Sequence, residues 1–352
     1  MSGTPSGRPS GPKSAGVWNN RGIRPVHGQR EGLTTPFTVR APASSANLGP
    51  GFDALGLALD LWNEIDVDPT VDQDRIEIRG RDADLLRGEG SAPHENLVLR
   101  AMRQLAEAHG WDLPPVGLTF RNGVPVSRGL GSSAAALAAG LLAADALLGL
   151  GLSRADIYGH AWRMEGHGDN VGAAIYGGAI LSVPGVPEAV QLIPPGSALS
   201  GLTAVVYIPG VTGATWAARA ALPATVPLPD AAFNLATTAG IVAGFLSGDR
   251  AVLGASMDDR LHQPYRARLF PHLDPVTRAA RSAGAFGAAL SGAGPTILAL
   301  TDTEMATFVR DAMADAGQRA GVPGESVTLA VTLEGAGIVH QDKTEVTPSR
   351  RG

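Results

Sequence analysis

The eleven-residue run from Pro125 to Ala135, PVSRGLGSSAA, constrains the fold of this chain more than any other segment. It follows an apolar stretch typical of a strand and precedes a long Ala/Leu-rich stretch typical of a helix. Gly129 and Gly131 allow turns in which successive backbone N–H groups converge on an anion. Ser132 and Ser133 stand where the helix begins and add hydroxyls to its free amides and positive dipole end. The segment predicts a phosphate-binding loop, although a glycine turn with a serine N-cap gives the same local pattern.

Lysine and cysteine usage narrows the chemistry. Lys13 and Lys343 are the only lysines among 28 basic residues, and both lie near the ends of the chain. A P-loop, a protein kinase site and a Schiff-base enzyme each need a lysine in the folded body, so these classes are excluded. There is no cysteine, which excludes thiol nucleophiles, disulfides and cysteine-type zinc sites and is compatible with the cytoplasmic location that we expect. A backbone phosphate loop needs no lysine and agrees with this composition.

The size and charge of the chain indicate a two-domain protein that acts on small molecules. Its 352 residues are enough for two domains, and a net charge of −5 gives no general basic field for nucleic acid. No run of 18 apolar residues predicts a membrane span, and residues 1–36 lack the apolar region of a signal peptide. Residues 1–36 are rich in Gly, Ser, Pro and Arg and predict a disordered tail. Residues 340–352 are expected to form a second, flexible tail.

The apolar periodicities predict an α+β fold, because short strands are interspersed with amphipathic helices. Alternating apolar residues predict strands at 38–41, 57–67, 76–78, 116–120, 179–183, 203–208, 286–290, 296–300 and 326–333. Helical spacing predicts helices at 95–109, 132–150, 153–165, 230–246, 275–283 and 303–320. The Pro-rich stretch 184–195 divides the chain into an N-terminal domain at 37–195, which carries the phosphate loop, and a C-terminal domain at 196–339.

Three other segments carry polar groups suited to a ligand. APASSANLGPGFD at 41–53 places hydroxyls, an amide and a carboxylate within ten residues, in a loop that either faces a small ligand or satisfies its own turns. AALSGAGPT at 288–296 joins two apolar strands and is also typical of a hairpin loop. Glu165 and Asp169 are carboxylates at a helix end, suited to Mg²⁺ on nucleotide phosphates. The nearby His167 is expected to have a packing or surface role rather than to bind zinc.

These segments occur in the order of the three motifs of the GHMP kinases, and the chain resembles the homoserine kinases of that superfamily. The residues that carry the resemblance are SSANLGPGFD at 44–53, EGHGDN at 165–170, DDRLHQPYR at 258–266 and Asn234. The resemblance covers residues 38–337. It implies a two-domain GHMP kinase fold, with a ribosomal-protein-like N-terminal domain and a ferredoxin-like C-terminal domain. It also implies ATP- and Mg²⁺-dependent phosphorylation of the L-homoserine side-chain hydroxyl, giving O-phospho-L-homoserine for threonine synthesis.

The resemblance assigns roles to individual positions. The ATP-binding residues are Pro125, Val126, Ser127, Arg128, Gly129, Leu130, Gly131, Ser132, Ser133, Ala134 and Ala135. The residues expected to bind homoserine are Asn47, Asp53, Asn170, Thr215, Arg219 and Arg266. The residues expected to be catalytic are Asn170, Asp169 and Arg219. The Mg²⁺ ligands are expected to be Ser133, with Ser132 as the alternative, and Glu165.

These assignments suit a zwitterionic amino acid, since Asp53 offers an anion for its ammonium and Arg219 and Arg266 offer forked cations for its carboxylate. We expect no strong general base and expect Asp169 to shape the site. The chain has HGDN at 167–170 where the family usually has His-Pro-Asp-Asn. The expected partners are ATP and L-homoserine, with no nucleic acid or membrane, and both a monomer and a homodimer are compatible with the sequence. The alternatives are a GHMP kinase for mevalonate or a sugar, and a non-catalytic ligand sensor.

Overall fold

The computed structural model describes residues 31–89, 96–193 and 197–339. Most of the predicted N-terminal tail and all of the predicted C-terminal tail lie outside the described residues. The last part of the N-terminal tail prediction, residues 31–36, is described and is docked on the body of the protein. The N–H of Leu33 donates to the carbonyl of Ala146 at 2.9 Å, and its side chain packs against a core cluster.

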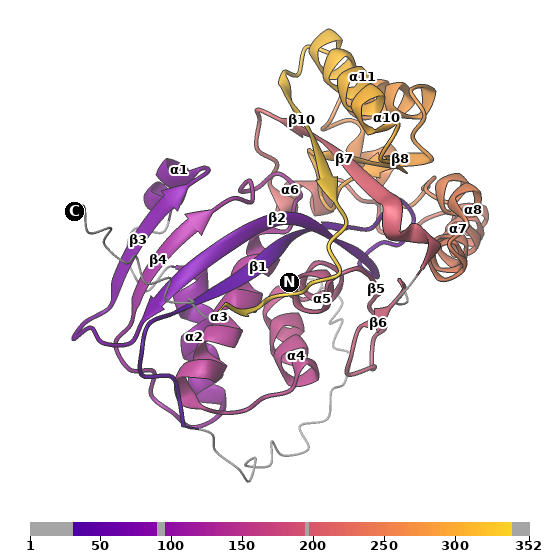
Figure 1. Ribbon diagram of the computed structural model, residues 1–352. Coiled ribbons are helices and arrows are strands. Elements are labelled where there is room, and N and C mark those ends of the chain that lie inside the picture. The colour runs from indigo at the N-terminus through magenta and orange to yellow at the C-terminus, as the bar shows by residue number, and fades with distance from the viewer. Residues whose placement is uncertain (1–30, 90–95, 194–196, 340–352) are drawn as a thin grey trace, which may run out of the picture.

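The N-terminal half is built on a seven-stranded sheet with a layer of helices on one face (Figure 1). Its strands are β1 (Phe37–Ala46), β2 (Leu55–Asp68), β3 (Arg75–Gly80), β4 (Gly117–Asn122), β5 (Ala179–Leu181), β6 (Val190–Gln191) and β11 (Gly337–Val339). The main path runs β11-β1-β2-β4-β3, and β5 and β6 extend from β2. Among the described residues, β3 and β4 are the one pair of strands that runs parallel. β11 lies in the predicted C-terminal range, but it pairs with β1 in this first sheet.

The helices of this half are α1 (Ala83–Glu89), α2 (Leu97–Ala108), α3 (Ser132–Leu148), α4 (Arg154–Glu165) and α5 (Asp169–Tyr176). α3 is central, because it packs on α2, α4, α5 and β1 and buries most of its Ala and Leu side chains. α2 and α4 begin where predicted, since Asn96 caps α2 and Ser153 forms a capping box with Asp156 at α4. The position of α3 fixes the phosphate loop at its N-terminus.

The C-terminal half is built on a four-stranded antiparallel sheet in the order β10-β7-β9-β8. Its strands are β7 (Leu202–Pro209), β8 (Gly287–Leu290), β9 (Ile297–Asp302) and β10 (Gly324–Ala330). Its helices are η2 (Ala198–Gly201), α6 (Thr215–Ala220), α7 (Leu228–Ser247), α8 (Arg250–Ala255), α9 (Gln263–Arg266), α10 (Leu273–Ser282) and α11 (Ala306–Arg319). The amphipathic helices α10 and α11 cover one face of the sheet (Figure 1).

A shared apolar core joins the two halves. Leu57 and Leu59 of β2 belong to the same buried cluster as Val206 of β7 and Ile241 and Phe245 of α7. The ends of β1 and β2 therefore pack against the C-terminal sheet, and the loop between these two strands lies at the junction. The expected two-domain α+β architecture is confirmed, and the junction places segments from both halves around one cleft.

Candidate active site

Three glycine-rich segments that are far apart in the sequence meet at the junction. The Ser291 hydroxyl lies 2.8 Å from that of Ser45 and 2.6 Å from the carbonyl oxygen of Gly129. The N–H of Ser44 donates to the carbonyl of Leu130 at 3.0 Å. Each of the three segments thus contacts the other two. Two of these contacts are made by the hydroxyl of the buried Ser291. The hairpin loop between β8 and β9 belongs to the C-terminal half. It connects the two strands and also holds the phosphate loop in place.

The phosphate loop depends on glycine at two positions. Gly129 has φ +78°, and a Cβ there would lie 2.3 Å from the carbonyl oxygen of Ser291. Gly131, the N-cap of α3, has φ +69°, and a Cβ there would lie 2.0 Å from the Ser44 hydroxyl. α3 has no side-chain cap, so its first amides remain available to an anion. Backbone geometry and the helix dipole thus make the loop suited to an anion without a lysine.

Arg128 holds this loop in place by side-chain contacts. Its Nη1 donates to Asp82 at 2.8 Å and to the carbonyl of Val126 at 3.0 Å, and its Nε donates to the carbonyl of Pro209 at 3.2 Å. The N–H of Val126 also donates to the Asp82 carboxylate at 2.9 Å. Asp82 therefore fixes both the backbone and the cation of the loop. The charge of Arg128 is already paired, which favours a structural role for its side chain.

The loop borders a cleft of about 350 Å³. Loop residues 125–133 line it, whereas the predicted ATP-binding residues Ala134 and Ala135 are fully buried in α3 and do not. One end of the cleft, which we call the apolar end, is lined mostly by apolar side chains. Its lining comes from several elements of the N-terminal half: Asn63, Glu64, Ile65, Ile78, Leu86, Asn96, Leu97, Val98, Phe120 and Asn122. The predicted homoserine-binding residues line the other end.

Asp53 and Arg219 form a paired charge at this second end. The Arg219 guanidinium donates to both carboxylate oxygens of Asp53, at 3.1 and 2.8 Å. Asn47 supports the loop, because its Oδ1 accepts the N–H of Asp53 at 3.1 Å and its Nδ2 donates to the carbonyl of Gly292 at 2.9 Å. Thr215 begins α6 one turn before Arg219, and both line the cleft. The structure thus brings together four of the residues predicted to bind homoserine.

Arg266 is a buried cation with no carboxylate partner among the described residues. It is 2% exposed and lines the cleft. Its Nε donates to the carbonyl of Ala218 at 3.2 Å, and its Nη1 donates to the carbonyl of Gly292 and to His262 Nδ1 at 3.1 and 3.2 Å. Burial, with the Arg219 charge nearby, lowers the pKa of Arg266 to about 10, so the group stays charged at neutral pH. A buried charge of this kind favours an anionic ligand group.

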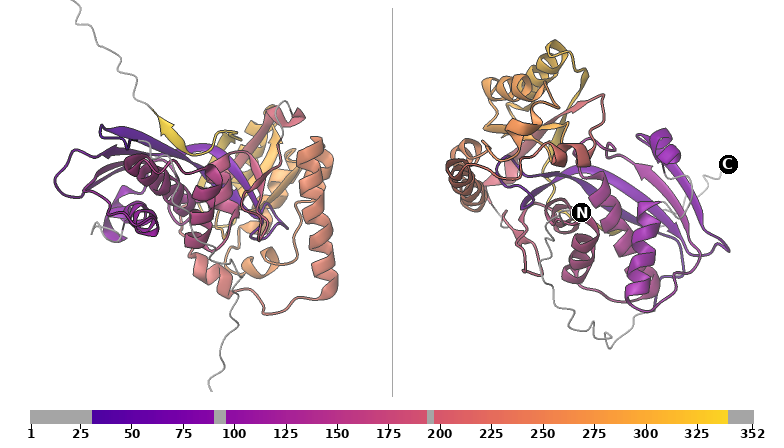
Figure 2. Two further views of the ribbon diagram at one scale, coloured as in Figure 1. Left: turned by 90° about the horizontal axis from the view of Figure 1, so that it is seen from below. Right: turned by 180° about the vertical axis from the view of Figure 1, so that it is seen from behind.

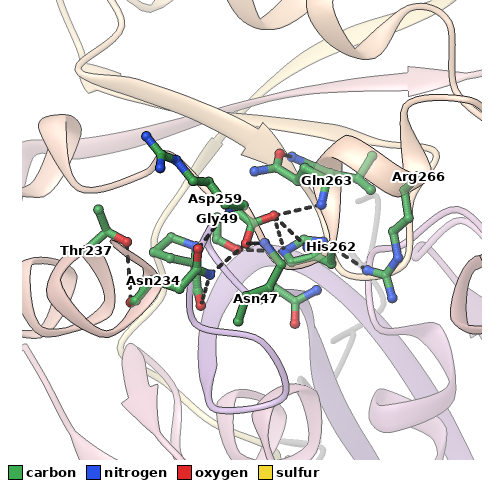
Figure 3. A network of polar contacts seen from close by, with 12 residues as sticks. Asn47, Gly49, Asn234, Thr237, Asp259, His262, Gln263 and Arg266 are labelled. Atoms are coloured by element: carbon green, nitrogen blue, oxygen red, sulfur yellow. Dashed lines mark hydrogen bonds and ion pairs between the residues drawn. The ribbon is translucent and has the colours of Figure 1, made fainter. Parts of the chain in front are cut away.

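A buried network fixes the direction of the Arg266 side chain (Figure 3). The Asp259 carboxylate accepts hydrogen bonds from Asn234 Nδ2 at 2.7 Å and from the N–H of His262 at 3.0 Å. His262 Nε2 donates to the carbonyl of Gly49 at 2.7 Å, which leaves Nδ1 free of a proton to accept from Arg266. Burial outweighs the nearby Asp259 charge and lowers the pKa of His262, so the ring is neutral. The neutral tautomer is the one that can hold Arg266.

Asp169 and Asn170 lie at the start of α5, and both line the cleft. Asn170 Oδ1 accepts a hydrogen bond from the Ser44 hydroxyl at 2.9 Å. Asp169 is 1% exposed, and its Oδ1 accepts from His167 Nδ1 at 2.5 Å and from the N–H of Asn170 at 2.7 Å. Burial alone would lower the pKa of His167, but the hydrogen bond and charge of Asp169, with Asp53 nearby, raise it. The Asp169 carboxylate therefore orients His167 and Asn170 through these hydrogen bonds.

Ser133 and Glu165 form an oxygen pair beside the phosphate loop. The Ser133 hydroxyl donates to Glu165 Oε2 at 3.0 Å, and both residues line the cleft. Ser132 also lines the cleft but makes no side-chain hydrogen bond with Glu165 in this structure. Hydroxyl and carboxylate oxygens are the ligands that Mg²⁺ prefers. The donor chemistry of the pair thus fits that ion.

Comparisons with known proteins identify the family of this chain. The model for the GHMP kinases N terminal domain matches residues 96–178, and that for the GHMP kinases C terminal matches residues 230–319. A homoserine kinase of Desulfitobacterium hafniense is 39% identical over 301 residues, which cover 86% of this chain and 99% of the relative. One of Gloeobacter violaceus is 43% identical over 279 residues, or 78% of this chain and 91% of the relative. The chain belongs to the homoserine kinase family of the GHMP kinases.

Solved structures agree with membership of the homoserine kinase family. The crystal structure of homoserine kinase from Cytophaga hutchinsonii has a TM-score of 0.77 and 30% identity, covering 88% of this chain and 99% of that one. The L. major mevalonate kinase in complex with R-mevalonate has a TM-score of 0.59 at 18% identity, covering 88% of this chain and 98% of that one, and shares the fold alone. The predicted family and GHMP kinase fold are confirmed.

The sequence did not predict two parts of the cleft lining, His167 and the apolar end. His167 was expected to pack or face solvent, but it lines the cleft and contacts Asp169. Its position next to a glycine-flanked Asp-Asn pair was the available signal. The apolar end of the cleft was not predicted, because residues such as Ile78 and Phe120 follow the same alternation as other strand residues. Their shared location depends on the pairing of β3 with β4.

Proposed function

We propose that this chain is a homoserine kinase, which transfers the γ-phosphoryl group of ATP to the side-chain hydroxyl of L-homoserine and gives O-phospho-L-homoserine for threonine synthesis. The observation that carries the proposal is Arg266, a buried cation beside the Asp53–Arg219 pair in the same cleft as the phosphate loop. A neutral sugar offers no anion for this cation. A lone carboxylate offers no ammonium for Asp53. An amino acid supplies both charges.

Substrate binding then follows from charge complementarity. The ammonium of homoserine pairs with Asp53, and its carboxylate pairs with Arg219 and Arg266, with Thr215 and Asn47 at the edges of the pocket. The Nη2 of Arg266 makes no hydrogen bond with any described residue, so the guanidinium keeps donor capacity for a carboxylate. Fixing both ends of the zwitterion leaves the side chain to carry its hydroxyl toward Asn170. Positioning of this kind accounts for much of catalysis in phosphoryl transfer.

ATP binds along the loop side of the cleft. The amides at the start of α3, with Gly129 and Gly131, hold the phosphates, and the apolar end around Phe120 receives the base. Residues 125–133 therefore act through their backbone more than through their side chains. The kinases of this family use ATP, and the loop geometry explains how a chain without lysine in its described residues does so.

Mg²⁺ is the second part of the proposal. Ser133, with Ser132 as the alternative, and Glu165 would hold the ion on the phosphates of ATP. The ion supplies charge neutralisation of the phosphate oxygens when bound. Glu165 is suited to this role because its carboxylate already faces the first turn of α3, where the phosphates are expected.

The reaction needs no strong general base from the protein. The homoserine oxygen forms the new bond to the γ-phosphorus as the bond from that phosphorus to the β–γ bridging oxygen breaks, and ADP leaves. The proton of the homoserine hydroxyl passes to an oxygen of the transferred phosphoryl group and from there to solvent. Asn170 cannot accept a proton, and Asp169 is held by His167 and by the N–H of Asn170. We therefore assign Asn170 to the acceptor side, Asp169 to shaping of the site and Arg219 to positioning and charge neutralisation.

A coupled ADP-release assay with L-homoserine, L-threonine, mevalonate and galactose side by side tests the assignment. We expect turnover with L-homoserine in the presence of ATP and Mg²⁺. Activity confined to mevalonate or galactose would overturn the substrate. No turnover with any of the four, from a chain that still binds ATP, would instead favour a ligand sensor on the same fold.

A further inference from the structure

Two histidines from different helices face each other outside the active-site cleft. His109 is the C-cap of α2, and His160 lies in the middle of α4. Their Nε2 atoms are 3.4 Å apart and their ring centroids are 5.4 Å apart, so the rings approach each other through these nitrogens. Both residues are half-buried, and neither lines the cleft. α2 and α4 belong to the helical layer of the N-terminal half, apart from the helices of the C-terminal half (Figures 1 and 2).

The backbone holds the two rings in fixed positions. Asn96 caps the start of α2, and at the other end of this helix the N–H of His109 donates to the carbonyl of Ala106 at 3.0 Å. α4 begins with the capping box at Ser153 and packs one face into the core. Both helices pack on α3. Side chains on packed helices keep the geometry of a ligand site better than side chains on loops do.

The distance between the two nitrogens distinguishes two explanations of their contact. Hydrogen bonds donated by an N–H group are mostly about 2.7–3.2 Å long, so 3.4 Å is long for a direct bond between the rings. A tetrahedral zinc ion with Zn–N bonds of about 2.0–2.1 Å holds two imidazole nitrogens about 3.3–3.4 Å apart. The observed separation therefore matches that of two ligands on one metal ion.

The charge state of His160 also suits a metal ligand. Burial, together with the charges of Arg163 and His109, lowers the pKa of His160 to about 4, so its ring is neutral at neutral pH. A neutral imidazole keeps one nitrogen free of a proton, and the lone pair of that nitrogen binds the metal. The Asp156 carboxylate acts against the charge of Arg163 and offsets part of its effect.

We propose that His109 and His160 bind one divalent transition metal ion that prefers imidazole, such as Zn²⁺ or Cu²⁺, through their Nε2 atoms. In the described residues the one group of three potential metal ligands is Asp53, His167 and Asp169 in the cleft, so water completes the coordination of an ion at the histidine pair. Mg²⁺ does not suit this pair, because it prefers oxygen ligands. The ion joins the end of α2 to α4. The proposal does not depend on the substrate assigned above.

The first experiment is a calorimetric titration of the chelator-treated full chain with Zn²⁺. The wild type should bind one equivalent more than His160→Gln, because a single imidazole cannot chelate the ion. His109→Gln should lose the same equivalent, and the double variant should lose no more than either single variant. Unchanged zinc binding in either single variant would overturn the proposal, as would a double variant that loses two equivalents.

His167→Gln is the control that separates the histidine pair from the cleft. This variant removes the histidine from the group with Asp53 and Asp169, but the equivalent that depends on His160 should remain. Histidines outside the described residues are the same in every variant, so they contribute equally to each titration. Loss of all zinc binding in His167→Gln would overturn the proposal. Displacement by Mg²⁺ of the equivalent that depends on His160 would overturn it as well.

The second experiment reads the ligands directly in the wild type, so it remains valid if a variant fails to fold. Cu²⁺ added at about half an equivalent should give an electron paramagnetic resonance spectrum with hyperfine splitting from two imidazole nitrogens on one copper ion. The folded double variant should lose this two-nitrogen spectrum. A wild-type spectrum with one nitrogen, or with oxygen ligands alone, would overturn the proposal, as would a two-nitrogen spectrum that persists in the double variant.

Discussion

The two ends of the cleft hold charge in different ways. The phosphate end is made of backbone, since Gly129 and Gly131 adopt positive φ and α3 begins with free amides. The proposed homoserine end is made of side chains, since Asp53 pairs with Arg219, and Arg266 is held by a buried neutral histidine. We expect ATP binding at the first end to be weakened by any atom added to these glycines. We expect homoserine binding at the second end to be weakened by any change in the charge or shape of the two guanidinium groups.

This difference also explains why the two ends are encoded differently. The phosphate end is lined by nine consecutive residues, 125–133, so most of its geometry is local. The homoserine end draws on the β1–β2 loop, α5, α6 and α9, which only the packed halves bring together. Substitutions at each end should therefore separate ATP binding from homoserine binding, and the predictions below use that separation.

The largest effect is expected for Gly129→Ala. The new Cβ would lie 2.3 Å from a backbone oxygen of the β8–β9 loop, which cannot turn away as a side chain would. Together with the cost of about 1–3 kcal/mol for a positive φ, this should reduce kcat/KM by at least about 100-fold, mainly through ATP binding. Gly151→Ala is the control, because Gly151 has φ +66° and nothing lies within 4 Å of a Cβ there. Unchanged ATP affinity in Gly129→Ala would contradict the backbone phosphate site.

Glu165→Gln should have an intermediate effect, confined to the metal. Loss of the carboxylate charge beside the Ser133 hydroxyl should raise the Mg²⁺ concentration for half-maximal activity by about 10- to 100-fold. A Mg²⁺ titration of the initial rate measures this shift. Glu107→Gln, at an exposed position on α2, should leave the titration unchanged. A loss of homoserine affinity at saturating Mg²⁺, with no shift in the titration, would argue against a metal role for Glu165.

The smallest effect on turnover is expected for Asp169→Asn. Because Asp169 positions its neighbours rather than taking a proton, kcat should fall about tenfold or less. The pKa of His167 should fall as well, since the hydrogen bond and charge that raise it are lost. That raised pKa contributes stability below the unfolded value of about 6.5, and the contribution is lost as the pH rises through the folded pKa. A loss of several orders of magnitude in kcat, with fold and ATP binding intact, would show that Asp169 is a base.

The His167 pKa is read by following its ring signals by NMR against pH in both proteins. His272 provides an internal reference, because burial lowers its pKa and it contacts the carbonyl of Pro295 rather than Asp169. Its titration should be the same in wild type and variant. An unchanged His167 titration in Asp169→Asn would remove the physical basis for the shaping role.

Sequence reasoning predicted the local parts of this molecule well. The long helices, the capping box at Ser153 and the glycine loop follow from short-range patterns, and the structure has each of them. The family resemblance supplied positions such as Asn47 and Arg266, which the structure brings to one cleft. Short helices such as α5 and α9 were not predicted, because a segment of eight residues or fewer shows too little periodicity to distinguish a helix from a turn.

Tertiary packing decides what the sequence patterns could not. The neutral state of His262 depends on its burial, and its ring contacts the carbonyl of Gly49, which lies 213 positions away in the sequence. The return of β11 to the first sheet depends on pairing with β1 across nearly the whole chain. The apolar residues of the nucleotide end follow the same alternation as core residues. In each case the missing information was a long-range contact.

The most direct test of the account is a calorimetric titration of Arg266→Lys with L-homoserine and, separately, with ATP in the presence of Mg²⁺. Lysine keeps the charge but loses the fork that contacts Gly292 and His262. Losing a buried charged hydrogen bond costs about 2 kcal/mol or more, so homoserine affinity should fall by about 30-fold or more, with ATP affinity within about twofold of wild type. Arg268→Lys, at an exposed neighbouring position, should change neither. Equal weakening of both ligands, or of neither, would contradict a cleft with separate phosphate and amino-acid ends.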